Sequence, residues 1–345
     1  MHANICLGYV MGRLVAELLI IVVIVGIILY LSSGGSLLNI NLIVSHPPAG
    51  GVTTSTPPEL NSTLNELIQK VLEKINQERE KLGLPPVRYV FDESAVFRAE
   101  DQLKREYFGH CSPEGLIPPY YYTKFGGLYY MEENIAYYYV ENLPMDPINY
   151  SLKNLDLMLY NDSASGWGHR DSLLDPTNNY ASVYAVWNSN RLFLVIDMLK
   201  VWVDWVSPPE LNGTVFSAEG FLLLNNSRIT SVVIYYHDPD TAKSATYSER
   251  LNINVTCRTY SLGYPYAGVV PKPYYFESIP TIRPDDWVMK GNYFRISFNV
   301  GDLDKPGLYT IVIYAENTLG IKHPYDPGRF ADSLPVLEYS FLKES

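Results

Sequence analysis

Two histidines and one glutamate are the residues of this sequence whose types and positions could do chemistry together. His110 ends a YFGH segment, His169 is the centre of a GHR segment, and Glu133 begins an ENIA segment. Two neutral imidazoles can bind a divalent cation such as zinc, and a nearby carboxylate can complete the coordination or fix a ring tautomer. The same side chains could orient a water molecule as a nucleophile. They could equally hydrogen-bond each other in a purely structural role, and the residues alone leave this alternative open.

Other reactive residues lack the partners that their chemistry requires. Cys111 adjoins the first histidine, but neighbouring residues in a chain point in different directions, and no Cys-His-Asn pattern is present. Ser112 and Ser172 lie near the histidines without a Gly-x-Ser-x-Gly turn, and the sequence has no phosphate-binding glycine loop. His237 and His323 lie in turn-like segments, where we expect them to be solvated or locally hydrogen-bonded.

The composition argues against nucleic acid as a partner and against a disulfide-rich scaffold. The 345 residues include 26 Lys and Arg against 37 Asp and Glu, for a formal net charge of −11. This charge repels phosphate backbones, so we expect no binding to nucleic acid. Of the three cysteines, Cys6 precedes a long apolar segment, so at most Cys111 and Cys257 can pair beyond it.

The first 59 residues predict a membrane element followed by a tether. Residues 18–31 are continuously apolar, and the wider stretch approaches the roughly 20 residues that span a bilayer. Arg13 precedes it, which favours a cytoplasmic N-terminus. We therefore predict a cytoplasmic tail and signal anchor at 1–31, a Pro-, Ser-, Thr- and Gly-rich linker at 32–59, and the rest of the chain outside the cell membrane as a single-pass protein. The alternative is secretion after cleavage of a signal peptide.

Glycosylation sequons agree with this export of the chain and predict a glycoprotein. Some Asn-x-Ser/Thr sites arise by chance, but here they all follow the apolar segment. The six sequons begin at Asn61, Asn149, Asn161, Asn212, Asn225 and Asn254.

Hydrophobic periodicity in residues 60–205 predicts an α+β domain. A capping-box pattern at Thr63 precedes an amphipathic helix. A second helix begins near Asp92 and carries His110 at its C-terminal end. A third helix and two β-branched segments typical of strands follow, at about 152–160, 180–187 and 192–205.

Five segments of this region occur in an order and spacing that a known family shares. They are INQER at 75–79, GLPPV at 83–87, YFGH with SPEG at 107–115, ENIA at 133–136, and GHR with LL at 168–174. Together they resemble the blocks of the CAP superfamily (SCP/PR-1-like) in its prokaryotic secreted type. The sequence departs from the family where YASV at 180–183 replaces a Gly-x-Gly strand start.

The resemblance implies a fold and a site. The fold is an α-β-α sandwich with a cleft into which two histidines and acidic side chains project, sometimes with a divalent metal such as zinc. His110 and His169 match the histidines, and Glu133 matches one of the acids. Asp162 is our choice for the second acid, with Glu132 as the alternative. A ligand set of two imidazoles and one carboxylate predicts weak, pH-dependent metal binding, because protonated histidine cannot bind a metal.

Residues 206–345 predict an all-β sandwich of the immunoglobulin or fibronectin type. Short β-branched runs alternate with turns rich in Asp, Pro and Gly, as in antiparallel sandwiches. No His, Cys or carboxylate set with ligand spacing is evident here, so we expect a spacer or adhesion module. The runs are 229–236, 251–257, 293–300, 308–315 and 335–341.

Three functions are consistent with these features. The first is an extracytoplasmic surface protein that binds a lipid, glycan or protein through the His/Glu cleft, with or without a metal. The second is a hydrolase of peptides or envelope polymers, in which His110, His169 and Glu133 activate water. The third is a structural component of the envelope. A resemblance in fold does not decide whether the chain is an enzyme.

Overall fold

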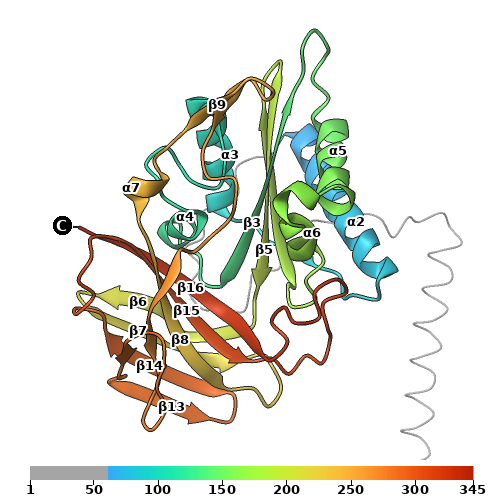
Figure 1. Ribbon diagram of the computed structural model, residues 1–345. Helices are drawn as coiled ribbons and strands as arrows, with labels where there is room; N and C mark the ends of the chain where they lie inside the picture. The colour runs from blue at the N-terminus through green and yellow to red at the C-terminus, as the bar shows by residue number, and fades with distance from the viewer. Residues whose placement is uncertain (1–60, 345) are drawn as a thin grey trace, which may run out of the picture. The chain divides into compact units, whose positions relative to one another are not determined.

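The computed structural model describes residues 61–344, so the predicted membrane anchor and linker lie outside the described residues. Within residues 61–344 no helix is long and apolar enough to cross a membrane. The described chain belongs to one compact α+β unit (Figure 1). We call residues 61–200 the mixed part and residues 203–344 the sandwich part. The predicted domain limits, 60–205 and 206–345, stay a prediction, because the two parts share this unit.

A four-stranded sheet forms the centre of the mixed part, with the strand order β1-β4-β5-β3. Strands β3 (Tyr130–Tyr139) and β4 (Tyr180–Trp187) both pair antiparallel with β5 (Arg191–Lys200). The short β1 (Arg88–Tyr89) runs parallel to β4. Strand β5 is buried along nearly its whole length, whereas β3 is an edge strand.

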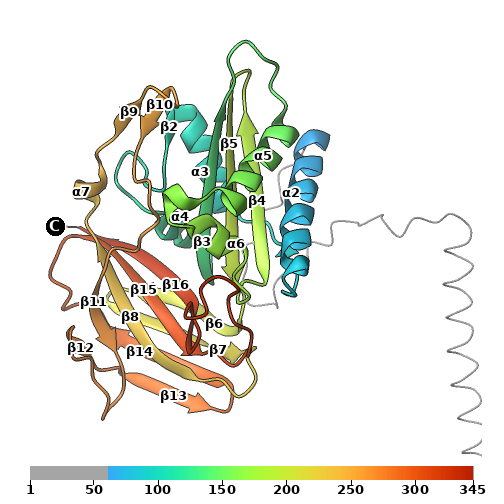
Figure 2. The same cartoon turned by 45° about the vertical axis from the view of Figure 1, so that its right-hand side comes forward.

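Helices cover both faces of this sheet, which gives three layers (Figures 1 and 2). Helices α2 (Ser62–Lys81) and α5 (Pro147–Tyr160) pack on the face that carries Leu194. Helix α3 (Glu93–Arg105) packs on the opposite face, against Val195. The shorter helices are α4 (Pro118–Lys124), the 3-10 turn η1 (Ser163–Ser165) and α6 (Gly168–Leu173).

Side-chain caps determine where the helices begin. The N-cap of α2 is Asn61, whose side chain accepts a hydrogen bond from the backbone N–H of Leu64 at 2.8 Å. The predicted capping box at Thr63 therefore lies inside the first turn. Asp92 caps α3 by accepting from the N–H of Ser94 at 2.8 Å, as the predicted start requires.

The prediction that a helix carries His110 is wrong. Helix α3 ends at Arg105, because Glu106 adopts a left-handed conformation. Tyr107–Phe108 then forms β2, which pairs in parallel with β10 (Ile253–Val255) from the sandwich part. His110 therefore follows a strand whose partner lies far away in the sequence.

Two sheets packed face to face form the sandwich part. One has the order β12-β11-β8-β15-β16, and the other β13-β14-β7-β6. Side chains from both sheets, including the fully buried Phe216, Phe294 and Ile311, form a common core. Four of the five predicted β-branched runs lie in these two sheets, but the run 251–257 contains β10, which pairs with β2 instead. The strands of the two sheets are β6 (Val203–Asn212), β7 (Val215–Leu222), β8 (Ile229–His237), β11 (Tyr264–Val269), β12 (Thr281–Ile282), β13 (Asp286–Lys290), β14 (Tyr293–Asn299), β15 (Gly307–Glu316) and β16 (Ser333–Lys343).

Two connections of the sandwich part return to the mixed part (Figures 1 and 2). The first arm, residues 238–263 between β8 and β11, contains α7 (Pro239–Ala242), β9 (Thr246–Ser248) and β10. It joins β2 in a sheet of order β2-β10-β9. The second arm, residues 317–332 between β15 and β16, lies beside α6. Both arms start from neighbouring strands of the same sheet.

Candidate functional site

His110 and Glu133 form a buried pair on the face of the sheet that α3 covers. His110 Nδ1 lies 3.0 Å from Glu133 Oε1, and the histidine is only 5% exposed. Side chains alternate along a strand, so Glu133 shares this face with Ile135. Burial lowers the pKa of His110 more than Glu133 raises it, so the imidazole is neutral at pH 7.

Arg98 on α3 neutralises the charge of Glu133. Its Nε donates to Glu133 Oε2 at 2.9 Å and its Nη2 donates to Oε1 at 3.2 Å, with both side chains buried. Nη2 also donates to the backbone carbonyls of Gly109 and His110, at 2.9 Å each. Burial raises the pKa of Glu133, but Arg98 and His110 outweigh it and the pKa is lowered. Glu133 is therefore an anion that orients the imidazole.

His169 has its own carboxylate partner, Asp162, which precedes η1. Asp162 Oδ1 lies 2.7 Å from His169 Nδ1. Its Oδ2 accepts from the backbone N–H groups of His169 and Arg170 at 2.9 and 3.3 Å. Burial raises the pKa of Asp162, but the hydrogen bonds from His169 and Ser165 outweigh it, and the pKa is lowered. The His169 side chain is 21% exposed, so this ring forms the solvent side of the site.

The structure brings the two pairs together. The ring centroids of His110 and His169 are 6.4 Å apart, and the ring planes are inclined by 26°. In each ring Nδ1 faces a carboxylate, so Nε2 is the nitrogen that remains for a ligand. The four predicted residues thus form two imidazole–carboxylate pairs at one place.

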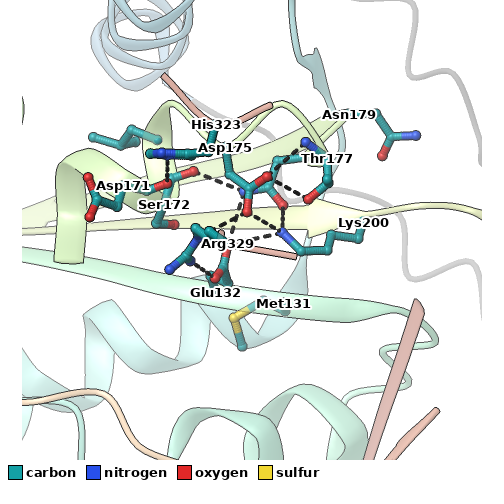
Figure 3. A network of polar contacts seen from close by, with 12 residues as sticks. Met131, Glu132, Asp171, Ser172, Asp175, Thr177, Asn179, Lys200, His323 and Arg329 are labelled. Atoms are coloured by element: carbon teal, nitrogen blue, oxygen red, sulfur yellow. Dashed lines mark hydrogen bonds and ion pairs between the residues drawn. The ribbon is translucent and has the colours of Figure 1, made fainter. Parts of the chain in front are cut away.

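Glu132, the alternative second acid, lies elsewhere. It precedes Glu133 on β3 and therefore points to the opposite face of the sheet. There it contacts Lys200 Nζ at 3.1 Å and the amide of Asn178 at 3.1 Å, and it pairs with Arg329 (Figure 3). These contacts belong to the interface between the two parts of the chain.

Sequence reasoning missed two residues of this site. Arg98 shares the buried face of α3 with Ala95 and Ala99. Its position on the same helix face as two alanines could have indicated that Arg98 is buried, but arginine side chains usually face solvent. Tyr260 comes from the first arm, and its ring lies nearly perpendicular to that of His110, with the centroids 5.7 Å apart. No local pattern indicates that contact.

The two imidazoles are an incomplete ligand set for a divalent cation. With a zinc–nitrogen bond of about 2.1 Å, a tetrahedral ion bound to both Nε2 atoms brings the ring centroids to about 5 Å, and only a linear arrangement reaches about 6.5 Å. The observed 6.4 Å therefore requires the two rings to approach each other when a cation binds. Among residues 61–344 no group of three or more His, Cys, Asp or Glu could hold a metal ion. Water or a bound ligand would have to supply the remaining positions.

Comparisons with known proteins add little to this geometry. No protein-family model matches the chain, and no characterised relative matches it. Among solved structures it is similar to NaASP2, crystallised with Zn²⁺, at 16% identity over 40% of this chain and 82% of that chain, with a TM-score of 0.30. It is also similar to the CAP domain of enterococcal PrgA, at 20% identity over 39% of this chain and 60% of that chain, with a TM-score of 0.28. Both TM-scores are too low to support a conclusion about the fold or the function of this chain.

Proposed function

We propose that this chain is a CAP-type protein of the cell exterior that binds a ligand at the His110–His169 site. A divalent cation such as zinc would be held by the two Nε2 atoms and would attract oxygen or nitrogen donors of the ligand. The observation that carries this proposal is the pair of neighbouring imidazoles, each held at Nδ1 by its own carboxylate. That arrangement orients histidines for metal binding and raises their basicity as ligands.

Hydrogen bonds between the sequence blocks support the CAP-type architecture. Asn76 donates to the carbonyl of Val87 at 3.0 Å and accepts from its N–H at 2.8 Å, which joins the first block to the second. Arg79 is fully buried and donates to three backbone carbonyls at and beyond the end of α6. Asn134 donates to the hydroxyl of Ser172 at 3.0 Å. The block residues thus hold the α2, β3 and α6 elements together.

Two features support a location outside the cell and a polar ligand. All six sequon asparagines are exposed, as glycosylation requires. Beside His169, the guanidinium of Arg170 lies 4.2 Å from the ring centre of Trp167 and 4.1 Å from that of Tyr325. An aromatic and cationic surface next to the site suits a glycan or an acidic protein group better than an acyl chain.

Hydrolysis is the second candidate function. A carboxylate that holds Nδ1 of a neutral histidine also prepares Nε2 to accept a proton from water. The lowered pKa of His110 keeps that nitrogen free to accept it. In this function Glu133 orients His110 and does not itself activate water, because Arg98 and His110 occupy both of its oxygens.

Zinc titration of the metal-stripped full chain tests the proposal. We expect isothermal calorimetry at pH 7.5 to give one zinc per chain, and binding to be lost in both His110→Ala and His169→Ala. His46→Ala is the matched control, because it removes a histidine of the predicted linker, and it should bind as the wild type does. Absence of binding by the wild type, or equal binding by all four proteins, would contradict the proposal. Hydrolysis of peptide and glycan substrates by the same proteins tests the second candidate.

A further inference from the structure

We propose that the sandwich part sets the geometry of the candidate site, because each of its two arms holds one of the two histidines. This inference rests on the site of the proposed function, but it requires neither a metal nor catalysis. It replaces the expectation that the sandwich part is a spacer.

The first arm holds the backbone around His110. The N–H of His110 donates to the carbonyl of Cys257 at 2.8 Å, and the N–H of Thr256 donates to the carbonyl of Phe108 at 3.0 Å. These bonds extend the pairing of β2 with β10. The hydroxyl of Thr256 donates to the carbonyl of Cys111 at 2.7 Å, and Cys111 forms a disulfide with Cys257. The segment that carries His110 is therefore fixed covalently and by three hydrogen bonds.

Close packing of the first arm also shields the His110 ring. The Tyr260 ring packs nearly perpendicular to the His110 ring, and its hydroxyl donates to the carbonyl of Met131 on β3 at 3.1 Å. At Gly109 the arm approaches so closely that an added Cβ would lie 2.1 Å from Thr256 Oγ1. His237, the last residue of β8 before this arm, lies with Nε2 2.9 Å from the carbonyl of Gly115.

The second arm holds α6, which carries His169. His323 Nε2 lies 2.9 Å from the carbonyl of Asp171, and its Nδ1 accepts from the N–H of Asp326 at 2.9 Å. That acceptor role places the ring proton on Nε2, so His323 donates to Asp171. Burial lowers the pKa of His323, although its contacts with Asp171 and Asp175 oppose the shift. His323 is 2% exposed, so of the two expected environments it has the locally hydrogen-bonded one, with an added bond to α6.

A buried ion network fixes the second arm to the sheet (Figure 3). Arg329 Nε donates to Asp175 Oδ2 at 3.1 Å, and Arg329 also pairs with Glu132, the neighbour of Glu133 on β3. Lys200 Nζ lies 3.1 Å from both carboxylates. Two cations and two anions therefore meet between β3, β5 and the segment after α6.

The separation of the two histidines follows from this arrangement. The arms connect β8 with β11 and β15 with β16, and β8 pairs directly with β15. A single sheet therefore supports both arms. Tyr260, His323 and Arg329 are positioning residues. Tyr260 contacts the His110 ring, and His323 and Arg329 act on His169 through the segment that carries it.

Hydrogen exchange of the full chain, measured by mass spectrometry without added metal, tests this inference. We expect Tyr260→Ala to speed amide exchange roughly tenfold in residues 107–111 and not in 168–175, and His323→Ala to do the reverse. The conservative His323→Gln keeps an N–H donor and should restore slow exchange in 168–175. Exposed residues of the same arms supply the controls Arg258→Ala and Lys322→Ala, which should change neither segment.

The outcomes separate this inference from the proposed function. Segment-specific exchange without zinc binding would leave the positioning role in place and refute the metal site. The positioning role would be overturned if the wild type binds zinc but the Tyr260 and His323 variants exchange as the wild type does in both segments. Equal acceleration of both segments by each variant would also overturn it. If an alanine variant unfolds, Tyr260→Phe, which loses only the hydroxyl bond to Met131, gives the same test of segment 107–111, with a smaller increase expected there alone.

Discussion

Arg98 is the residue whose removal should damage the site most. Its guanidinium supplies a bidentate pair to Glu133 and bonds to the carbonyls of Gly109 and His110. Arg98→Leu keeps an apolar stem on α3 but leaves Glu133 as a buried, uncompensated carboxylate. Breaking a buried pair in this way costs about 3–5 kcal/mol. Arg98→Lys keeps the charge but loses the planar fork, and we expect it to cost about 1–2 kcal/mol through its lost hydrogen bonds.

A double-mutant cycle isolates the coupling between the two side chains. We expect Arg98→Leu to cost at least about 1 kcal/mol less in a Glu133→Gln background than in the wild type, because the uncompensated charge is then absent. Urea-induced unfolding followed by tryptophan fluorescence measures each free energy of unfolding. Equal costs of Arg98→Leu in the two backgrounds would show that Arg98 does not serve Glu133, and would refute the reasoning about how His110 is held.

Three further predictions concern the stability of the fold at low pH, the packing of the first arm at Gly109, and the pair of His169 with Asp162. Burial opposes ionisation of Asp175, but Lys200 and Arg329 lower its pKa to about 2. The ionised Asp175 therefore stabilises the fold by about 2 kcal/mol above pH 4, and this contribution is lost as the pH falls toward 2. We expect the melting temperatures of Asp175→Asn and the wild type to converge over that range. Gly109→Ala should cost about 1–3 kcal/mol in calorimetry through its clash with Thr256 and its φ of +154°. The cost should exceed that of Gly83→Ala, which is strained at a φ of +68° but whose Cβ would meet no atom within 4 Å. Asp162→Asn should weaken zinc binding about 10–100-fold in a calorimetric titration, because His169 loses its orienting carboxylate.

Local patterns predicted most of the elements, and the family resemblance supplied the candidate site residues, but neither predicted the way in which His110 is placed. The periodicity of 64–75 and the alternation in 180–187 are properties of each segment alone, and α2 and β4 appear where they indicate. Strand β2 exists only because β10 pairs with it, and Tyr107 is 147 positions away from its register partner Asn254. A helical pattern continued past Arg105 therefore gave the wrong element.

The same limit explains which side chains were missed. Glu133 and Glu132 are adjacent and chemically identical, and the strand pleat alone sends one to His110 and the other to Lys200. Arg98 and His323 are residue types that are usually solvated, and only partners from other elements make their burial favourable. The family resemblance identified the candidate residues of the site. It did not identify the contacts that hold these residues, because the partners in the two arms lie outside the five sequence blocks.

A crystal structure of the chain soaked in zinc, with anomalous diffraction recorded at the zinc edge, tests the central claim most directly. We expect one strong anomalous peak within about 2.1 Å of Nε2 of both His110 and His169, with Nδ1 of the two rings still bound to Glu133 and Asp162 respectively. A peak that contacts neither ring, or imidazoles that turn away from each other in the presence of zinc, would contradict it.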